Sequence, residues 1–256
     1  MFTHKTKIVC SMGPSTNDDE VVSRLIIAGM NVARFNFSHG THESHKDAME
    51  RVKRVSAKLN RPIALMLDTK GPEIRTGNTE GDSIVQFNKG DKVWITVDET
   101  LTKAATKTKA GTLSISWKEL PQRVQQGHRI LIADGLLELD VEETDGFTVK
   151  CVAKNSAAIG SKKNVNLIGL HAGLPIMSEQ DKNDIKFGAE QDVDFIAASF
   201  VSYASEVQEI RRYLDTLNSR AKIIAKIENE EGLNNIREIA ATADGIMIAR
   251  GDLGVQ

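Results

Sequence analysis

Short apolar runs alternate with amphipathic helical segments, and this alternation constrains the fold more than any other feature of the chain. A mostly apolar run at 7–11 precedes a helical segment at 15–29, which ends at a glycine, a common helix C-terminal signal. The run at 62–69 is almost continuously apolar, as expected for a parallel strand that is covered on both faces. Strand–helix repetition of this kind favours a parallel α/β sheet or barrel.

The same alternation returns in the C-terminal part of the chain. Apolar runs lie at 193–200, 222–228 and 245–252, and capped helical segments lie at 178–191 and 205–217. Together the two parts carry about six predicted strands.

Helical periodicity fades between residues 72 and 169. Short runs of strand-like residues appear there, separated by Gly, Asp and Asn, and they include KVWITV, TLSISW, RILIADGLLELDV and FTVKCV. Alternation of apolar and polar residues bounded by turn residues predicts half-buried strands. We therefore expect a discontinuous α/β domain at 1–71 and 170–256, interrupted by an inserted all-β domain at 72–169.

The composition excludes several classes of protein. Of the 256 residues, 40% are hydrophobic and 27% are charged, and the formal net charge is −2. A charge so near balance argues against a nucleic-acid-binding or membrane-binding surface, and no apolar run approaches the roughly 20 residues of a membrane helix. The N-terminus does not resemble a signal peptide, and the two cysteines lie far apart, which fits a reducing cytoplasm.

Polar side chains gather where the predicted strands end. They are Asn36 and Ser38, Asp68 and Thr69, Lys226 and Glu228, and Arg250 and Asp252. In a (β/α)₈ barrel the carboxyl ends of the strands meet at one rim, and active sites are built at that rim. The pattern therefore predicts a functional site there.

Lys226 and Glu228 stand out because they follow an apolar run that is expected to be buried. Residues i and i+2 of a strand point to the same face, and isolated buried charges are costly unless they are paired or bound to an ion. An ion pair at a strand end explains both residues. A site in which one group holds a metal ion and the other faces a substrate is the alternative to this simpler interpretation, and both stay open at this point.

Arg34, Asn36 and Ser38 alternate along one predicted strand and so share a face. An arginine suits a phosphate or carboxylate, and the oxygens of Asn and Ser suit a weakly charged cation. The alternative is an edge strand with a polar face, but Phe35 and Phe37 on the opposite face argue that both faces are covered.

Three histidines, His39, His42 and His45, recur at a spacing of three residues. Such spacing leaves a zinc site open as an interpretation. No cysteine or carboxylate nearby completes a tetrahedral ligand set, so a polar helix start is favoured, with His39 as a possible ligand contact.

Two further segments carry charges that suit a polyphosphate. Glu73 and Arg75 follow a Gly-Pro turn, and Lys162 and Lys163 lie near the end of the predicted insert. A solvated connection and a solvated loop are the simpler interpretations. Asp252 is flanked by glycines that allow a close backbone approach, but the segment lacks the spacing of a dinucleotide-binding fingerprint.

Seven segments taken together resemble the pyruvate kinase family, in the family's order from about residue 5 to residue 255. They are TKIVCSMGPST, GMNVARFNFSHG, LDTKGPEIRTG, GSKKNVNL, SEQDKNDIKFGAEQDVDFIAASF, AKIENEEGLNN and DGIMIARGDLGV. The resemblance implies a (β/α)₈ TIM barrel with an inserted all-β, barrel-like lid. It also implies phosphoryl transfer from phosphoenolpyruvate to ADP in glycolysis, by a cytoplasmic homotetramer that uses Mg²⁺ (or Mn²⁺) and K⁺.

The resemblance also implies residue roles. Lys226 and Arg34 match the catalytic residues, and both match substrate contacts together with Gly251 and Asp252. The implied ligands of the divalent ion are Glu228 and Asp252, and those of K⁺ are Asn36, Ser38, Asp68 and Thr69. His39, Arg75 and Lys163 match nucleotide contacts, and Glu73 matches the residue that goes with dependence on K⁺.

The chain departs from the family's pattern after Gln256, where the family has two more barrel strands and a further domain. On this ground we expect an incomplete barrel of about six strands that is poorly stable alone. A non-catalytic fragment that retains the ligand residues is therefore one alternative. Another is an aldolase-type, metal-dependent barrel that acts on phosphoenolpyruvate or pyruvate, although the paired lysines, the insert and Arg75 favour a nucleotide.

Overall fold

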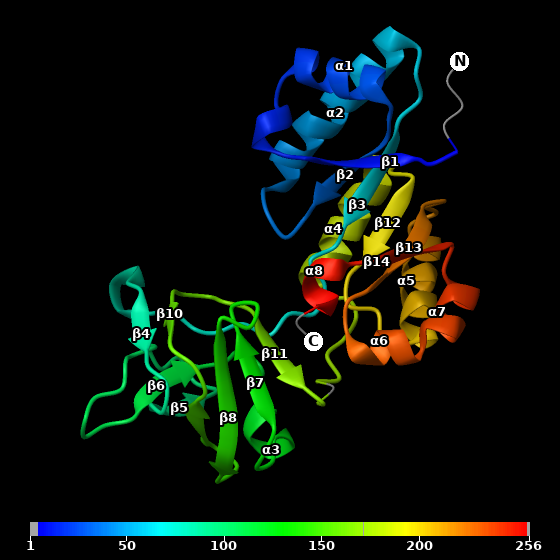
Figure 1. The fold of residues 1–256 in the computed structure, drawn as a ribbon. Helices are drawn as coiled ribbons and strands as arrows, with labels where there is room; N and C mark the ends of the chain where they lie inside the picture. The colour runs from blue at the N-terminus through cyan, green and yellow to red at the C-terminus, as the bar shows by residue number, and fades with distance from the viewer. Residues whose placement is uncertain (1–4, 171, 255–256) are drawn as a thin grey trace. The chain divides into compact units, whose positions relative to one another are not determined.

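The computed structural model describes residues 5–170 and 172–254. The chain forms two compact units (Figure 1). The first, here the α/β unit, comprises Met1–Pro72 and Pro175–Arg250, and the second, here the β unit, comprises Glu73–Leu174 and Gly251–Gln256.

A parallel sheet of six strands forms the centre of the α/β unit, in the order β1-β2-β3-β12-β13-β14. Its strands are β1 (Ile8–Met12), β2 (Met30–Asn36), β3 (Ala64–Asp68), β12 (Phe195–Ala198), β13 (Lys222–Ile227) and β14 (Gly245–Ile248). Every neighbouring pair is parallel, so the chain must cross over between consecutive strands. The predicted α/β class is confirmed.

Helices make most of these crossovers. They are α1 (Asp19–Ala28), α2 (His42–Leu59), α4 (Glu179–Glu190), α5 (Ala204–Thr216), α6 (Glu230–Asn234) and α7 (Ile236–Thr242), with a 3₁₀ turn η1 at Pro14–Thr16. Local chemistry sets their ends. The Asp18 carboxylate accepts hydrogen bonds from the amides of Glu20 and Val21 and so starts α1, and Gly29, at φ 116°, ends it.

The core of the α/β unit lies between the sheet and its helices. Phe35, Leu67, Ile196 and Ile223 come from four adjacent strands, and each is at most 1% exposed. Burial of a side chain of this size stabilises a fold by about 1.5–3 kcal/mol. The core therefore holds the carboxyl ends of these strands in fixed positions relative to one another.

The β unit contains a mixed sheet of six strands in the order β11-β7-β8-β9-β5-β6 and a two-stranded sheet of β10 and β4. Its elements are η2 (Glu80–Asp82), β4 (Val85–Phe87), β5 (Lys92–Thr96), β6 (Gly111–Ser114), α3 (Leu120–Arg123), β7 (Arg129–Ile132), β8 (Leu137–Thr144), β9 (Val149–Ala153), β10 (Ala157–Ile159) and β11 (Val165–Ile168).

Residues 74–77 join the two edges of this larger sheet. On one side the amide of Val165 donates to the Ile74 carbonyl at 2.8 Å, and the amide of Thr76 donates to Lys163 at 2.7 Å. On the other side the amide of Gly77 donates to the Ser114 carbonyl at 2.9 Å. The pairing is therefore continuous around the sheet, which removes exposed strand edges. The enclosed core includes Cys151, and burial raises the pKa of its thiol to about 12, so this cysteine stays protonated.

Two predicted strands differ from the observed ones. The run at 129–141 is divided into β7 and β8, because Ala133 and Asp134 adopt φ values of 54° and 56° and form a turn with Gly135. The run at 245–252 also ends early. β14 stops at Ile248, and residues Arg250–Leu253 form the short helix α8. Asp252 therefore lies in a helix rather than at the end of a strand.

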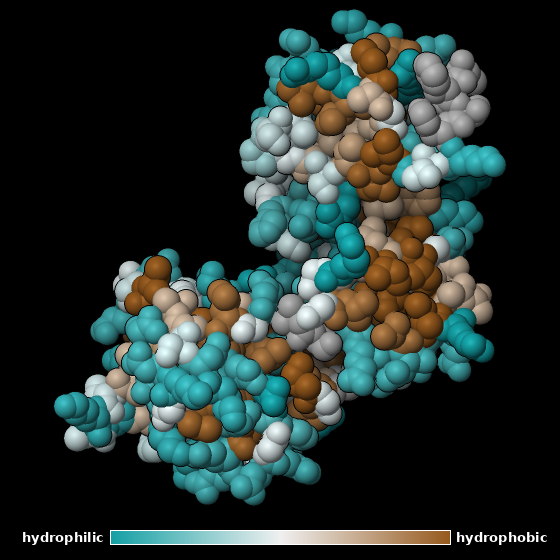
Figure 2. All heavy atoms as spheres, viewed as in Figure 1, coloured by the Kyte–Doolittle hydropathy of each residue, from teal (hydrophilic) through white to brown (hydrophobic). Residues whose placement is uncertain are grey.

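Some large apolar side chains remain at the surface, where Figure 2 shows hydrophobic atoms among hydrophilic ones. In the α/β unit they include Ile8 and Val9 on β1 and Ile248 on β14, each nearly half exposed. In the β unit, Phe147 is 81% exposed. None of the helices in the described residues has both the length and the apolar character needed to cross a bilayer.

Gly71 occupies a position where any side chain is strained and crowded, which gives the first prediction. Its φ is +73°, and an added Cβ would lie 2.7 Å from the Cβ of Ser199. We expect Gly71→Ala to lower the free energy of unfolding of the α/β unit by about 2–4 kcal/mol, from backbone strain and overpacking together. Urea unfolding followed by circular dichroism at 222 nm measures this, because every helix longer than four residues in the described chain belongs to this unit.

Gly29→Ala is the matched control, since Gly29 also has a positive φ but its nearest neighbour would be an ordinary 3.7 Å away. It should lose only the strain component, about 1–2 kcal/mol. Both tryptophans, Trp94 and Trp117, lie in the β unit, so their fluorescence should follow an unchanged transition. Equal losses in the two variants would rule out the steric part of the argument.

Candidate functional site

Four charged side chains meet at the carboxyl end of the parallel sheet. Arg34 lies on β2, Asp68 ends β3, Lys226 lies on β13, and Glu228 follows β13. Asp68 and Glu228 are each 1% exposed and Lys226 is 7% exposed, so the groups are almost dry. The sequence prediction that polar groups at the strand ends lie close together holds for Asp68, Lys226 and Glu228.

Lys226 has a partner for each of its three N–H donors. Its Nζ lies 2.9 Å from Asp68 Oδ1 and 3.0 Å from Glu228 Oε1. The third donor is directed at the hydroxyl of Ser199, at 2.7 Å. A buried ammonium is tolerated only when it is paired and hydrogen-bonded in this way. The ion-pair interpretation of Lys226 and Glu228 is therefore correct for this state of the chain, and it does not exclude the metal-and-substrate interpretation.

Asp68 links Lys226 to Arg34. The Nε and Nη2 atoms of Arg34 each lie 2.5 Å from Asp68 Oδ2, and Nη1 donates to the Ser11 hydroxyl at 2.6 Å. Two cations and two carboxylates leave the cluster formally neutral. The Arg34 side chain is 27% exposed, so its guanidinium keeps access to solvent and to an anionic ligand.

Sequence reasoning missed Ser199 and Phe200. The Ser199 hydroxyl donates to the Thr69 carbonyl at 2.6 Å, and the amide of Phe200 donates to Glu228 Oε2 at 2.7 Å. Phe200 has φ +59°, an uncommon conformation for a bulky residue, and such outliers cluster at functional sites. The signal for Ser199 was present in the sequence, because it is a polar residue at the end of an apolar run, as Asp68 and Glu228 are.

The predicted K⁺ ligands come from adjacent strand ends. Asn36 and Asp68 are register partners, and the Asn36 side-chain oxygen accepts from the Ser38 amide at 3.0 Å. Thr69 follows directly and is 5% exposed. The set offers only oxygen donors, of which one is a carboxylate, and this chemistry fits a large, weakly charged cation such as K⁺.

Only one of the two predicted ligands of the divalent ion, Glu228, lies in the α/β unit. Carboxylate oxygens are the ligands that Mg²⁺ and Mn²⁺ prefer, so Glu228 fits such an ion. No group of three or more His, Cys, Asp or Glu side chains in the described residues is arranged to hold a metal. Gly251 and Asp252 lie in α8 and group with the β unit, so their position relative to Lys226 stays a prediction.

The β unit brings two predicted nucleotide contacts together. Arg75 forms a β-bridge with Asn164, next to Lys163, and the amide of Lys163 donates to the Thr76 hydroxyl at 2.9 Å. Glu73 holds the Arg75 guanidinium through hydrogen bonds of 2.8 and 3.0 Å. The Arg75 side chain is 36% exposed, so the pair presents a partly accessible cation.

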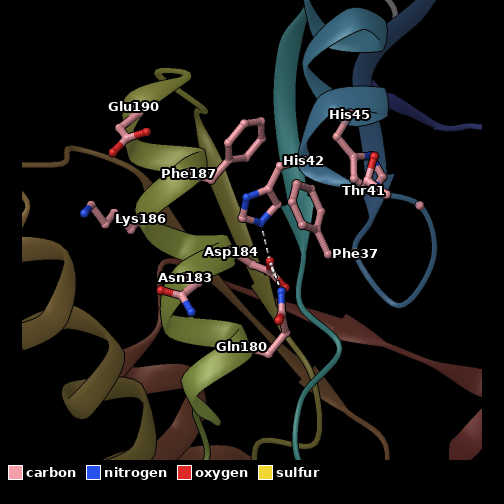
Figure 3. A pocket seen from close by; sticks show the side chains of 11 residues that line it. Phe37, Thr41, His42, His45, Gln180, Asn183, Asp184, Lys186, Phe187 and Glu190 are labelled. Carbon is pink, nitrogen blue, oxygen red and sulfur yellow. Dashed lines mark hydrogen bonds and ion pairs between the residues drawn. The ribbon is translucent and has the colours of Figure 1, made fainter.

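His42 contributes to packing between α2 and α4. A cavity of about 640 Å³ lies there (Figure 3), and His42 projects into it from α2, with its Nε2 atom 2.6 Å from Asp184 Oδ1 on α4. His42 also stacks on Phe187, with ring centroids 4.4 Å apart.

A hydrogen-bond contact connects His45, on α2, to the backbone of His39, just before this helix. His45 Nε2 lies 2.8 Å from the His39 carbonyl, and the His45 ring stacks on Phe37 with centroids 4.1 Å apart. Burial lowers the pKa of His45, so its ring is neutral at pH 7. The histidines are thus engaged with a carboxylate, a carbonyl and aromatic rings, and the zinc interpretation finds no ligand set among the described residues.

Comparison with known proteins identifies the family. Residues 3–256 match the family model described as pyruvate kinase, barrel domain. The chain belongs to the pyruvate kinase family. The resemblance found in the seven sequence segments is therefore confirmed.

Sequence identity, coverage and structural similarity to individual pyruvate kinases measure how closely the chain follows the family. The pyruvate kinase of Staphylococcus aureus strain MRSA252 is 45% identical over 254 residues, which cover 98% of this chain and 42% of that protein. The pyruvate kinase of strain USA300 gives the same figures. A crystal structure of a pyruvate kinase from Cryptosporidium parvum matches with a TM-score of 0.91 at 42% identity and covers 98% of this chain and 51% of that chain. The chain thus spans less than half of the curated pyruvate kinases it matches.

Asp68 separates two buried or half-buried cations, and this gives the second prediction. Asp68→Asn leaves Arg34 and Lys226 facing a neutral amide, so we expect the free energy of unfolding to fall by about 3–5 kcal/mol. Adding Lys226→Met leaves one cation, Arg34, and one carboxylate, Glu228, so the cluster is formally neutral again and the double variant should regain about 1–3 kcal/mol. Urea unfolding at 222 nm measures all four members of the cycle. Additive losses would show that Asp68 and Lys226 do not interact in the folded chain.

Proposed function

We propose that the chain carries the phosphoryl-transfer residues of a pyruvate kinase, which converts phosphoenolpyruvate and ADP to pyruvate and ATP in glycolysis. The observation that supports this most directly is the cluster of Lys226, Arg34, Asp68 and Glu228 at the carboxyl end of the sheet, in a chain of the pyruvate kinase family. We also propose that the parallel sheet belongs to a (β/α)₈ TIM barrel and that residues 72–169 form its inserted lid.

Lys226 and Arg34 are the proposed catalytic and substrate-binding residues. Phosphoryl transfer passes through an anionic transition state, so positioning and charge neutralisation matter more than covalent chemistry. An incoming phosphate competes with Asp68 and Glu228 for the N–H groups of Lys226. The ammonium then lies beside the transferring group and the enolate oxygen, while Arg34, through its exposed side, binds the phosphate.

Two kinds of cation complete the proposed site. Glu228 and Asp252 hold Mg²⁺ (or Mn²⁺), and Asn36, Ser38, Asp68 and Thr69 hold K⁺. When bound, these ions supply positive charge that neutralises the phosphate and the developing enolate. Gly251 approaches the substrate carboxylate through its backbone. The nearly complete burial of Asp68 and Glu228 strengthens every electrostatic interaction there, because little water screens it.

His39, Arg75 and Lys163 are the proposed ADP contacts. The assignment of Arg75 and Lys163 to one ligand is supported by their position on neighbouring segments of the β unit. Glu73, which orients Arg75, is the residue proposed to go with dependence on K⁺. We further propose that the whole protein acts in the cytoplasm as a homotetramer.

Removal of the Lys226 charge is the direct test of this function. Lys226→Met should lower turnover by about 10²–10³-fold, because one charge that stabilises the transition state is lost. The affinity for phosphoenolpyruvate should stay within a few fold. Pyruvate formation coupled to lactate dehydrogenase measures turnover, and calorimetry measures binding of phosphoenolpyruvate and of ADP.

Lys222→Met is the matched control, because it removes a lysine from the opposite end of the same strand, where Lys222 pairs with Asp244 at 3.2 Å. It should turn over like the parent. Unchanged turnover in Lys226→Met would refute the assignment.

Dependence on K⁺ tests the second cation site. Replacing K⁺ with tetramethylammonium at constant ionic strength should abolish pyruvate formation, because a large organic cation cannot be ligated by the oxygens of the predicted set. The same coupled assay measures this. Full activity without K⁺ would contradict the role of Glu73 and of the four predicted ligands.

A further inference from the structure

We infer that Ser199 is a positioning residue that connects Lys226 to the oxygen atoms proposed to hold K⁺. The inference deepens the proposed function and rests on it. Ser199 follows β12, which lies between β3 and β13 in the sheet, so its hydroxyl stands between Thr69 and Lys226. The residue is 3% exposed, and its hydrogen bonds therefore go to the protein rather than to solvent.

The direction of the hydrogen bonds at Ser199 follows from the number of its protons. A serine hydroxyl donates one hydrogen bond and accepts up to two. Its Oγ lies 2.6 Å from the Thr69 carbonyl and 3.4 Å from Asp68 Oδ1, so the proton goes to Thr69. An ammonium only donates, and Lys226 Nζ donates to the same Oγ at 2.7 Å. The hydrogen bonds therefore run in one direction, from Lys226 through Ser199 to Thr69.

Thr69 is held to this segment by two further hydrogen bonds. The amide of Ser199 donates to the Thr69 hydroxyl at 3.1 Å, and the amide of Thr69 donates to the Ala197 carbonyl at 3.0 Å. With the Ser199 hydroxyl, these bonds fix the orientation of the Thr69 peptide. Thr69 belongs to the proposed K⁺ ligand set, so the geometry of that set depends on Ser199.

Ser199 differs from the other partners of Lys226 because it carries no charge. Asp68 and Glu228 are both proposed cation ligands, and a cation bound to them competes with the ammonium for the same oxygens. The neutral Ser199 hydroxyl is not subject to that competition in the same degree. It therefore keeps Lys226 oriented when the cations and the substrate are bound, and at the same time it keeps the Thr69 carbonyl directed.

The test compares three variants of the chain. Ser199→Ala removes the hydroxyl, and Ser199→Cys keeps a side chain of similar size whose thiol is a weak hydrogen-bonding group. Ser202→Ala is the control, because Ser202 is 1% exposed and its hydroxyl bonds to Asn229 and Phe200 instead of Lys226 or Thr69. It reproduces the stability cost of losing a buried hydroxyl nearby.

The first measurement is the melting temperature at rising KCl, with tetramethylammonium chloride keeping the ionic strength constant. It yields an apparent dissociation constant for K⁺ without any need for turnover. We expect this constant to rise about 5–10-fold in Ser199→Ala and Ser199→Cys, the effect of losing one hydrogen bond, and to stay unchanged in Ser202→Ala. A role in stability alone would lower every melting temperature and leave the K⁺ dependence the same.

The second measurement is turnover, where Ser199→Ala should lower kcat about 10-fold with KM for phosphoenolpyruvate changed less than about threefold. If Ser199→Ala weakens the stabilisation of the chain by K⁺, the inference is supported. This holds even when the parent chain shows no turnover, and that result would contradict only the proposed activity. An unchanged K⁺ constant in Ser199→Ala overturns the inference. So does a parent chain that K⁺ does not stabilise.

Discussion

The site depends on the carboxylate of Asp68, which bonds to cations on both sides. Arg34 reaches it from the neighbouring strand β2, and Lys226 reaches it from β13, two strands away across β12. Two strand spacings amount to about 9–10 Å, a gap that only a side chain as long as lysine spans. Without this carboxylate, Lys226 would keep only one counter-charge, Glu228, in a nearly dry environment. The three side chains therefore hold each other in place, and the sheet fixes the distance between them.

This mutual pairing has a consequence for ligand binding. Two cations and two carboxylates form a neutral cluster, so an incoming anion disturbs the balance unless positive charge arrives with it. A cation held by the carboxylates would release N–H groups of Lys226 and Arg34 for the anion. The electrostatics of the cluster thus favour joint binding of cations and an anionic substrate over binding of either alone. Such behaviour is what the proposed phosphoryl-transfer site requires.

Much of this arrangement was predictable from the sequence, for reasons of periodicity. The position of Lys226 and Glu228 two residues apart on a strand placed them on one face, and Asp68 ended an equally apolar run. Ser199 was missed because one serine after an apolar run is a weak signal without its partners. The positive φ of Phe200 was not predictable, since it accompanies a hydrogen bond from its amide to Glu228, a residue far away in the sequence. The short helix α8 was also not predicted, because the sequence of its first residues suggests a continuation of β14.

Asp181 shows how the α/β unit holds both ends of the inserted segment. Its Oδ1 accepts from the amide of Gly71, just before the chain leaves this unit, and its Oδ2 accepts from the amide of Ser178, just after the chain returns. Asp181 is 1% exposed and also caps α4, so one buried carboxylate fixes the two connections and a helix start. Gly71 in turn packs so closely against Ser199 that there is no room for a Cβ between them. A chain of contacts therefore runs from Asp181 through Gly71 and Ser199 to Lys226. It connects the residues that hold the ends of the inserted segment to those that position the lysine.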